Sequence, residues 1–163
     1  MHPSDLPPPS AGFLVWHLAM RWRAELDRAL AAHGLTSAQY AVLASLHALT
    51  TGGARPSQRE LADFASLEPM YVSKLVTALE RSGLVRRATH PDDSRAVQLE
   101  ITAAGDAAVR AARAQVRAID DDRLRVLGGP RSAESEALRA SLERLLRDTE
   151  GRRDRLARPA DAG

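Results

Sequence analysis

Apolar residues recur along most of this chain at helical spacing, and only one short stretch alternates instead. Leu18, Trp22 and Leu26 begin one apolar stripe, and residues 72–79 carry another with apolar side chains three and four positions apart. This spacing places one apolar face along a helix. Over residues 97–101, Val, Leu and Ile alternate with Gln and Glu, which predicts a strand with one buried face.

Turn and capping residues divide the pattern into elements. Ser57 followed by Glu60 forms a capping box, Pro69 suits the first turn of a helix, and Gly83 suits its end. A mainly α chain with a small β-hairpin is therefore expected. The predicted helices span about residues 11–32, 37–50, 57–65, 69–82, 103–127 and from 132 or 135 onward, and the predicted strands 84–88 and 97–101.

Composition narrows the classes of function. Apolar residues make up 44% of the 163 residues and charged residues 27%, which is enough for a core. The net charge is only +2, so overall charge is weak support for a nucleic-acid partner. The absence of Cys excludes disulfides and thiolate chemistry. Neither a long apolar run nor a signal-peptide pattern occurs, so we expect a cytoplasmic protein with no membrane partner.

Motifs for enzymatic chemistry are missing from the sequence. It contains no Gly-rich phosphate loop, no G-x-S-x-G and no H-E-x-x-H. Residues 120–122 are consecutive Asp, but adjacent carboxylates on a helix fan around its axis and do not converge on a cation. His17 and His47 lie on separate predicted helices, without a carboxylate at ligand spacing beside either. We therefore expect no enzyme activity, no cofactor and no metal site.

The predicted helices around residues 57–65 and 69–82 are joined by a short turn, as in a helix-turn-helix. The second helix has one apolar face, and its other face carries residue types that suit a DNA major groove. An ordinary helical hairpin with a solvated face explains the segment equally well. The outward-facing residues are Met70, Tyr71, Ser73, Lys74, Thr77 and Arg81.

A hairpin directly after a helix-turn-helix can serve as a wing that reaches the neighbouring minor groove. Arg95 lies near its predicted tip, with Arg86, Arg87 and His90 nearby. Asp93 can accept a hydrogen bond from Arg95 and fix its direction. A solvated turn with a surface ion pair is the alternative.

Two further apolar stripes have no obvious partner within a winged domain. One lies on the predicted fifth helix and the other on the sixth, and both would stay exposed in a monomer. A homodimer is therefore expected, with the two copies related by a two-fold axis. The stripes consist of Val109, Ala112, Val116 and Ile119, and of Leu138, Leu142, Leu145 and Leu146.

Several motifs, in their order and spacing, resemble the multiple-antibiotic-resistance regulator (MarR) family over roughly residues 11–150. They are Leu-Thr-Ser-Ala-Gln-Tyr at 35–40, Gln-Arg-Glu-Leu-Ala at 58–62, Leu-Glu-Arg-Ser-Gly-Leu-Val at 79–85, Asp-Ser-Arg at 93–95, and Ile-Thr-Ala-Ala-Gly at 101–105. The resemblance implies a winged helix-turn-helix homodimer. Its first, fifth and sixth helices would build the dimer interface, and its fourth helix would read the major groove.

Residue by residue, the resemblance carries over three groups. Residues 69–77 match the start of the recognition helix, Asp93 and Arg95 match the wing tip, and Ser57 and Gln58 match the start of the supporting helix. Combined with the outward face of the fourth helix and with the other polar and basic residues of the hairpin, they give one candidate set. The candidate DNA-contacting residues are Ser57, Gln58, Pro69, Met70, Tyr71, Ser73, Lys74, Thr77, Arg81, Arg87, His90, Asp93, Ser94 and Arg95.

Regulators of this kind often release DNA when a small aromatic or phenolic molecule binds beside the dimer region. Aromatic, His and Met residues on the first two helices are candidates for such a site, although core and interface packing explains them as well. The peroxide-sensing mechanism of some family members needs a Cys and is excluded. The candidate effector-binding residues are Trp16, His17, Met20, Tyr40, Leu43 and His47.

The sequence thus predicts a winged helix-turn-helix regulator that binds double-stranded DNA. We expect a ligand-responsive repressor that acts as a homodimer on a pseudo-palindromic operator; a helical protein-interaction module on the same fold is the alternative. The expected organisation is a flexible arm at 1–10, a dimerisation region at 11–34 and 103–156, a DNA-binding domain at 35–102, and a flexible tail at 157–163.

Overall fold

The computed structural model describes residues 8–90 and 93–157, and the side chains at 89–96, 150 and 153–157 lie outside the description. Most of the predicted arm and tail therefore also lies outside the described residues. The elements in chain order are α1 (Ala11–Leu30), η2 (Ala31–His33), α2 (Ser37–Thr51), α3 (Gln58–Phe64), α4 (Pro69–Arg81), β1 (Val85–His90), β2 (Asp93–Ile101), α5 (Ala103–Arg123), η3 (Leu124–Leu127) and α6 (Ala133–Ala157).

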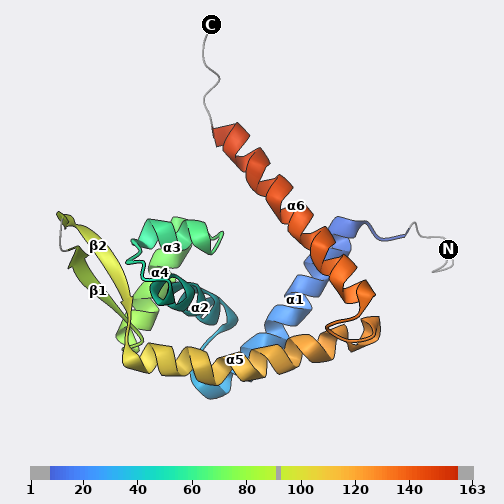
Figure 1. The fold of residues 1–163 in the computed structure, drawn as a ribbon, viewed down its shortest axis with the longest axis horizontal. Helices are drawn as coiled ribbons and strands as arrows, with labels where there is room; N and C mark the ends of the chain where they lie inside the picture. Colours follow the sequence, from blue (N-terminus) through green and yellow to red (C-terminus); the bar gives the residue numbers. More distant parts are fainter. Residues whose placement is uncertain (1–7, 91–92, 158–163) are drawn as a thin grey trace, which may run out of the picture. The chain divides into compact units, whose positions relative to one another are not determined.

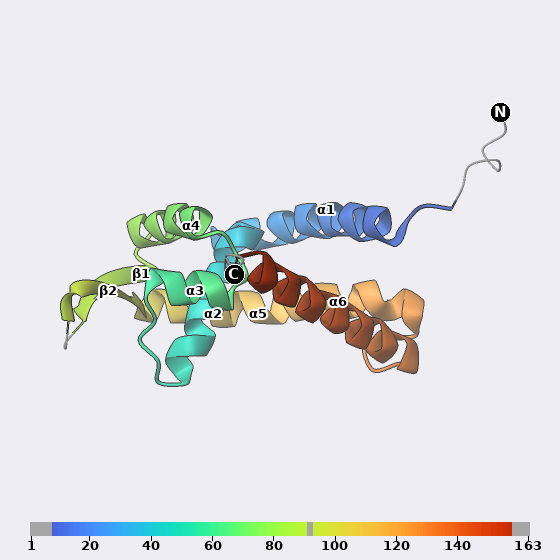
Figure 2. The same cartoon turned by 90° about the horizontal axis from the view of Figure 1, so that it is seen from above.

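The chain divides into two compact units, one up to Val116 and one from Arg117 onward. In the first unit the hairpin lies at one end of the group α2, α3 and α4 (Figure 1). The view from above shows the same order, with both strands beyond the ends of α3 and α4 (Figure 2). A mainly helical fold with one antiparallel hairpin is confirmed.

One apolar core holds the first unit together. Residues from α2 and α4 dominate it, because each helix turns three regularly spaced aliphatic side chains inward. Leu30, Leu61 and Leu99 join them from α1, α3 and β2, and each is at most 1% exposed. The core residues are Leu30, Leu35, Val42, Leu43, Leu46, Leu61, Ala62, Val72, Val76, Leu79, Val85, Leu99, Val109 and Ala112.

Capping groups define where the helices begin. Ser57 Oγ accepts from Glu60 N at 3.2 Å while the Glu60 carboxylate accepts from Ser57 N at 2.7 Å, so the predicted capping box is confirmed. Thr36 and Gln39 form a second capping box at the start of α2. Each box satisfies backbone N–H groups that the first helical turn leaves free.

Strand β2 departs from the predicted alternation. Leu99 is buried as expected, but Val97 is 50% exposed and the polar Gln98 is only 3% exposed. The loop before α3 explains the difference, because it pairs with β2: Leu99 N donates to Pro56 O at 2.8 Å, and Ser57 bridges to Gln98. The expectation of a single buried face was therefore wrong around Gln98.

The start of α5 is attached to the segment that leaves α4. Thr102 Oγ1 donates to Gly83 O at 2.7 Å, and Thr102 N donates to Leu84 O at 3.1 Å. Gly105 approaches so closely that a Cβ there would lie 2.1 Å from Leu84 O. Only Gly fits this approach without moving backbone.

The first half of the α5 stripe has a partner within its own chain. Val109 and Ala112 are 0% exposed and belong to the core, and Val116 packs against it. The expectation that this stripe lacks a partner was therefore wrong for these residues. The predicted helix also ends earlier, because α5 gives way at Leu124 to the 3₁₀ turn η3 and then to Gly128 at φ 83°.

The second unit contains the end of α5, η3 and α6. The turn before α6 is held by Ser132, whose Oγ accepts from Ser135 N at 3.1 Å, and by Ser135, whose Oγ donates to Gly129 O at 2.8 Å. Further along α6, Leu145 is 60% exposed and Leu146 is 63% exposed. None of the helices in residues 8–90 and 93–157 has the length and apolar character needed to cross a membrane.

Candidate nucleic-acid interface

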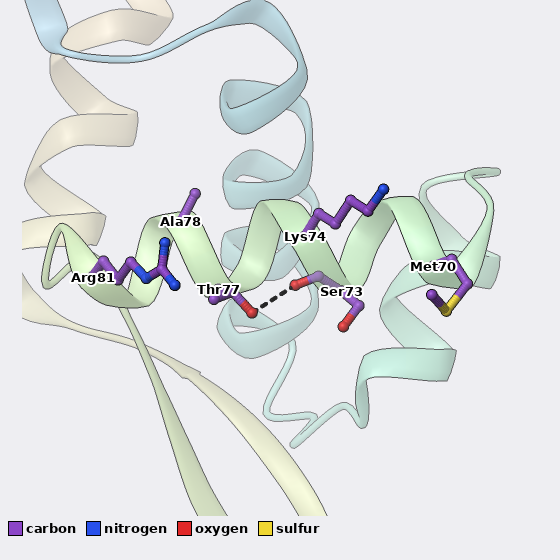
Figure 3. Close-up of a pocket in the computed structure, with 6 residues that line it drawn as sticks. All are labelled: Met70, Ser73, Lys74, Thr77, Ala78 and Arg81. Atoms are coloured by element: carbon purple, nitrogen blue, oxygen red, sulfur yellow. Dashed lines mark hydrogen bonds between the residues drawn. The ribbon is translucent and has the colours of Figure 1, made fainter.

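Helix α4 separates its side chains into a buried face and a polar face. Val72, Val76 and Leu79 are 0% exposed and hold the helix against the core. On another side an open groove follows the helix from Met70 to Arg81 (Figure 3). It is lined by Met70, Ser73, Lys74, Thr77, Ala78 and Arg81.

The groove carries positive charge that no described carboxylate neutralises. Among the residues the structure describes, neither Lys74 nor Arg81 has a carboxylate partner. Arg86 on β1, by contrast, pairs with Glu100 on β2. The two free cations, with the hydroxyl of Ser73 between Met70 and Lys74, can meet phosphate oxygens and base edges.

The remaining α4 candidates lie at its first turn. Pro69 is the first helical residue, where its missing N–H costs nothing. Met70 is 74% exposed and Tyr71 is 39% exposed, so both present apolar surface to solvent. Such side chains suit contact with thymine methyl groups or sugars.

Arg87 on β1 has partners on two helices. Its Nη1 pairs with Oε2 of Glu80, and its backbone N–H donates to Glu80 Oε1 at 3.3 Å. Its Nη2 donates to Thr77 Oγ1 at 3.2 Å and to Gln58 Oε1 at 3.5 Å. The guanidinium therefore links α3, α4 and β1 among the described residues.

Sequence reasoning missed Glu80 because its partner lies on another element. Its spacing of i+3 from Thr77 was the one available signal, since this places both residues on one side of α4. No local pattern indicated that a strand residue, Arg87, would reach both of them.

The start of α3 presents Ser57 and Gln58, both half-buried. The Ser57 oxygen and backbone N–H are occupied by the capping box with Glu60, which leaves its hydroxyl proton available. Gln58 is the first residue of the helix and lies within reach of Arg87.

The predicted wing residues fall where side chains are not described. The backbone of His90 ends β1, and the backbone of Asp93 begins β2. The register of the hairpin shifts between Thr89 and His90. The side chains of His90, Asp93, Ser94 and Arg95 lie outside the described residues, so the brace between Asp93 and Arg95 stays a prediction.

The candidate effector residues divide into exposed and packed groups. Trp16 is 59% exposed and Met20 44%, while Leu43 is 0% exposed within the core and Tyr40 packs partly against it. The His17 ring lies 4.7 Å from that of Trp16, and its Nδ1 is 3.1 Å from Phe13 O. The exposed members offer aromatic surface, whereas Leu43 supports the fold.

His47 has an acidic partner that the sequence did not indicate. Its Nδ1 lies 3.1 Å from Asp106 Oδ1, and Asp106 also pairs with Arg110. No carboxylate lies at ligand spacing beside His47 in the sequence, but α5 brings Asp106 to α2 from far along the chain. No cluster of three metal-ligating side chains occurs within the described part of the chain.

The C-terminal part of α1 is hydrogen-bonded to the start of α2 through Asp27. Its Oδ1 accepts from Ser37 N at 2.6 Å. Hydrogen bonds from the Ser37 hydroxyl and backbone, with Arg23 nearby, hold the pKa of Asp27 below its usual value. A carboxylate here also complements the positive end of the α2 dipole.

Comparison with known proteins places this fold and surface in context. The model of the MarR family matches residues 35–97. An uncharacterised HTH-type transcriptional regulator of Bacillus subtilis, YdcH, is 36% identical over 70% of this chain and 78% of its own. The HTH-type transcriptional repressor Rv2887 of Mycobacterium tuberculosis is 31% identical over 84% of this chain and 94% of its own.

Solved structures show the same architecture. The transcriptional repressor CouR, bound to a 23-mer DNA duplex, superposes with a TM-score of 0.73 and is 27% identical. The match covers 84% of this chain and 92% of that one. The winged helical fold deduced above is therefore confirmed.

Proposed function

Because the chain belongs to the MarR family of transcriptional regulators, we propose that it is a homodimeric, ligand-responsive repressor of a pseudo-palindromic DNA operator. As a member it is a DNA-binding regulator of transcription and not an enzyme. The repressor role is supported by relatives that carry the word repressor in their names, among them Rv2887 and CouR.

The observation that carries the proposal is the arrangement of α4. Three fully buried side chains fix its orientation, while Lys74 and Arg81 stand along its outer groove without carboxylate partners among the described residues. A helix held in this way can enter the major groove without losing its own packing. Lys74, Ser73, Thr77 and Tyr71 would then approach base edges or phosphates.

The hairpin and the start of α3 would contact the flanking backbone. Arg95 would enter the minor groove beside the site, aimed by Asp93, with His90 and Ser94 close to the phosphates. Ser57 and Gln58 would face phosphate on the other side of α4. The strands of the hairpin, β1 and β2, extend further toward the tip than the sequence predicted, which supports a hairpin that reaches beyond the helices (Figure 1).

The proposed dimer is supported by apolar surface that the single chain leaves exposed. The first half of α1 exposes six large apolar side chains, and α6 exposes Leu145 and Leu146. Exposed apolar groups of this number usually mark an interface. A two-fold axis would present two α4 helices to half-sites about one helical turn, ~34 Å, apart. The α1 residues are Phe13, Leu14, Val15, Trp16, Leu18 and Met20.

The effector of the proposed repressor is a small aromatic or phenolic molecule. Trp16, His17 and Met20 offer exposed aromatic and thioether surface on α1, and Tyr40 and His47 offer polar groups on α2. Binding would raise the thermal stability of the protein and lower its affinity for DNA by linkage. A panel of phenolic compounds without either shift would contradict this part of the proposal.

Lys74→Ala tests the central contact. We expect it to weaken binding to a selected duplex by about 1–3 kcal/mol, and to reduce the slope of log affinity against log salt by about one if Lys74 meets a phosphate. Arg113→Ala, an exposed cation on α5, is the matched control and should leave both quantities unchanged. Equal effects of the two variants would remove α4 from DNA contact.

Arg95→Ala tests the wing in the same assay. A loss of about 1–3 kcal/mol of binding free energy is expected, without a change of melting temperature. An unchanged affinity would remove the wing from the mechanism. A protein-interaction module, the alternative function, would show no steep salt dependence with any duplex.

A further inference from the structure

Arg87 is an unusual member of the candidate DNA surface because its charge is already neutralised. Glu80 pairs with it, and its side chain is only 30% exposed. Its Nη2 donates to protein oxygens on Thr77 and Gln58. These commitments leave it poorly placed to serve as a free cation for phosphate.

We propose that Arg87 is a positioning residue that determines which hydrogen-bonding groups Thr77 and Gln58 present to DNA. The inference rests on the proposed function, in which α4 enters the major groove. Arg87 acts through the two polar side chains that it touches, and Glu80 holds its guanidinium in the required orientation.

The hydroxyl of Thr77 is left as an acceptor. Its single proton is donated to Ser73 O at 2.9 Å, as shown in Figure 3, and one lone pair accepts from Arg87. A hydroxyl has one donor and two acceptor sites, so the free site of Thr77 is a lone pair. In the major groove the matching donors are adenine N6 and cytosine N4, and the Thr methyl also suits a thymine methyl.

Gln58, unlike Thr77, is left with hydrogen-bond donors. A guanidinium has only donors, so the atom that faces Arg87 must be the amide oxygen. The NH₂ group of Gln58 is thereby turned away from Arg87. Two donors at the start of α3 suit the phosphate oxygens of the backbone, which only accept hydrogen bonds.

The ion pair with Glu80 holds the Arg87 guanidinium in the orientation that donates to Thr77 and Gln58. Glu80 binds both the backbone N–H and the guanidinium of Arg87, so the planar group cannot rotate away from Thr77 without breaking a charged contact. A guanidinium can serve two acceptors on different helices in one plane, which an ammonium does less well.

Arg87→Lys in the full-length protein tests the inference, with a duplex that the wild type selects from a randomised library. The variant keeps the charge beside Glu80 but loses the planar fork. We expect preference at one base pair under α4 to fall roughly three- to tenfold, the effect of one hydrogen bond. The salt slope should stay the same, and the melting temperature should stay within about 4 °C.

Thr77→Val identifies the base pair concerned and does not depend on the folding of the Arg87 variant. It should abolish preference for adenine or cytosine at that same position. Combining it with Arg87→Lys should change the preference no further, because the two residues act as one unit. A separate, additive loss in the double variant would overturn the inference.

Two other outcomes would also overturn it. Unchanged preference and affinity in Arg87→Lys would mean that a positive charge alone suffices, as for a direct phosphate contact. A uniform loss over all duplexes, with a large fall in melting temperature, would mean that Arg87 only stabilises the fold. If the wild type itself selects no sequence and Lys74→Ala has no effect, the proposed function fails, and this inference with it.

Discussion

Helix α4 and the first half of α1 contain similar numbers of apolar residues but dispose of them in opposite ways. On α4 Val72, Val76 and Leu79 are buried against the core, whereas Met70 at the first turn is exposed and the polar side chains face outward. On α1 the six large apolar residues between Phe13 and Met20 are between 43% and 59% exposed. Helix α4 therefore packs its main apolar face within its own chain, whereas the first half of α1 leaves apolar surface exposed. In the proposed function the outer face of α4 meets DNA and the exposed half of α1 meets a second copy of the chain.

The largest expected effect comes from removing a buried apolar side chain of α4. Leu79→Ala deletes a fully buried side chain and should lower the free energy of unfolding by about 2–5 kcal/mol. Met70→Ala on the same helix removes a side chain that is 74% exposed and should change it by less than about 0.5 kcal/mol. Urea denaturation measures both. Equal losses would show that the outer face of α4 is also packed.

Introducing charged residues into the exposed half of α1 tests whether it forms the proposed dimer interface. Trp16→Glu combined with Leu18→Glu should weaken the proposed dimer by about 2 kcal/mol or more, since buried carboxylates replace apolar contacts. Light scattering over a dilution series reports the change of mass.

Phe64→Glu provides the control for these α1 substitutions. Phe64 on α3 is 55% exposed and lies outside the proposed dimer surface, so its substitution should leave the mass unchanged. A wild-type protein that stays monomeric at micromolar concentration would contradict the assignment of α1.

The smallest expected effect concerns the point where α1 becomes anchored. Asp27→Asn should cost about 0.5 kcal/mol at neutral pH, because the carboxylate that accepts from Ser37 is partly exposed. The folded-state pKa of Asp27 is lowered, so its contribution is present above about pH 4 and is lost as pH falls through the folded-state pKa. Thermal melts of both proteins should therefore converge in acid. A constant difference would exclude the charge of Asp27 as its cause.

Periodicity and capping residues were sufficient to predict the order of the helices, the hairpin and the inward face of α4. They report that a face is apolar, but they do not identify what covers it. For this reason Val109 was expected at an interface and instead belongs to the core, and Gln98 was expected in solvent and instead lies beneath the loop before α3. The same limit hid the partners of His47 and Arg87, since contacts between distant elements leave no local pattern.

The attachment of Thr102 and Gly105 to the residues after α4 gives the molecule a mechanical property. Two hydrogen bonds and a backbone contact that only Gly allows hold the start of α5 against the segment after α4. Rotation of the first turn of α5 against the segment after α4 would have to break these hydrogen bonds or move the contacting backbone. In the proposed function, a movement at the start of α5 would therefore reorient α4 without any contact at the outer face of α4.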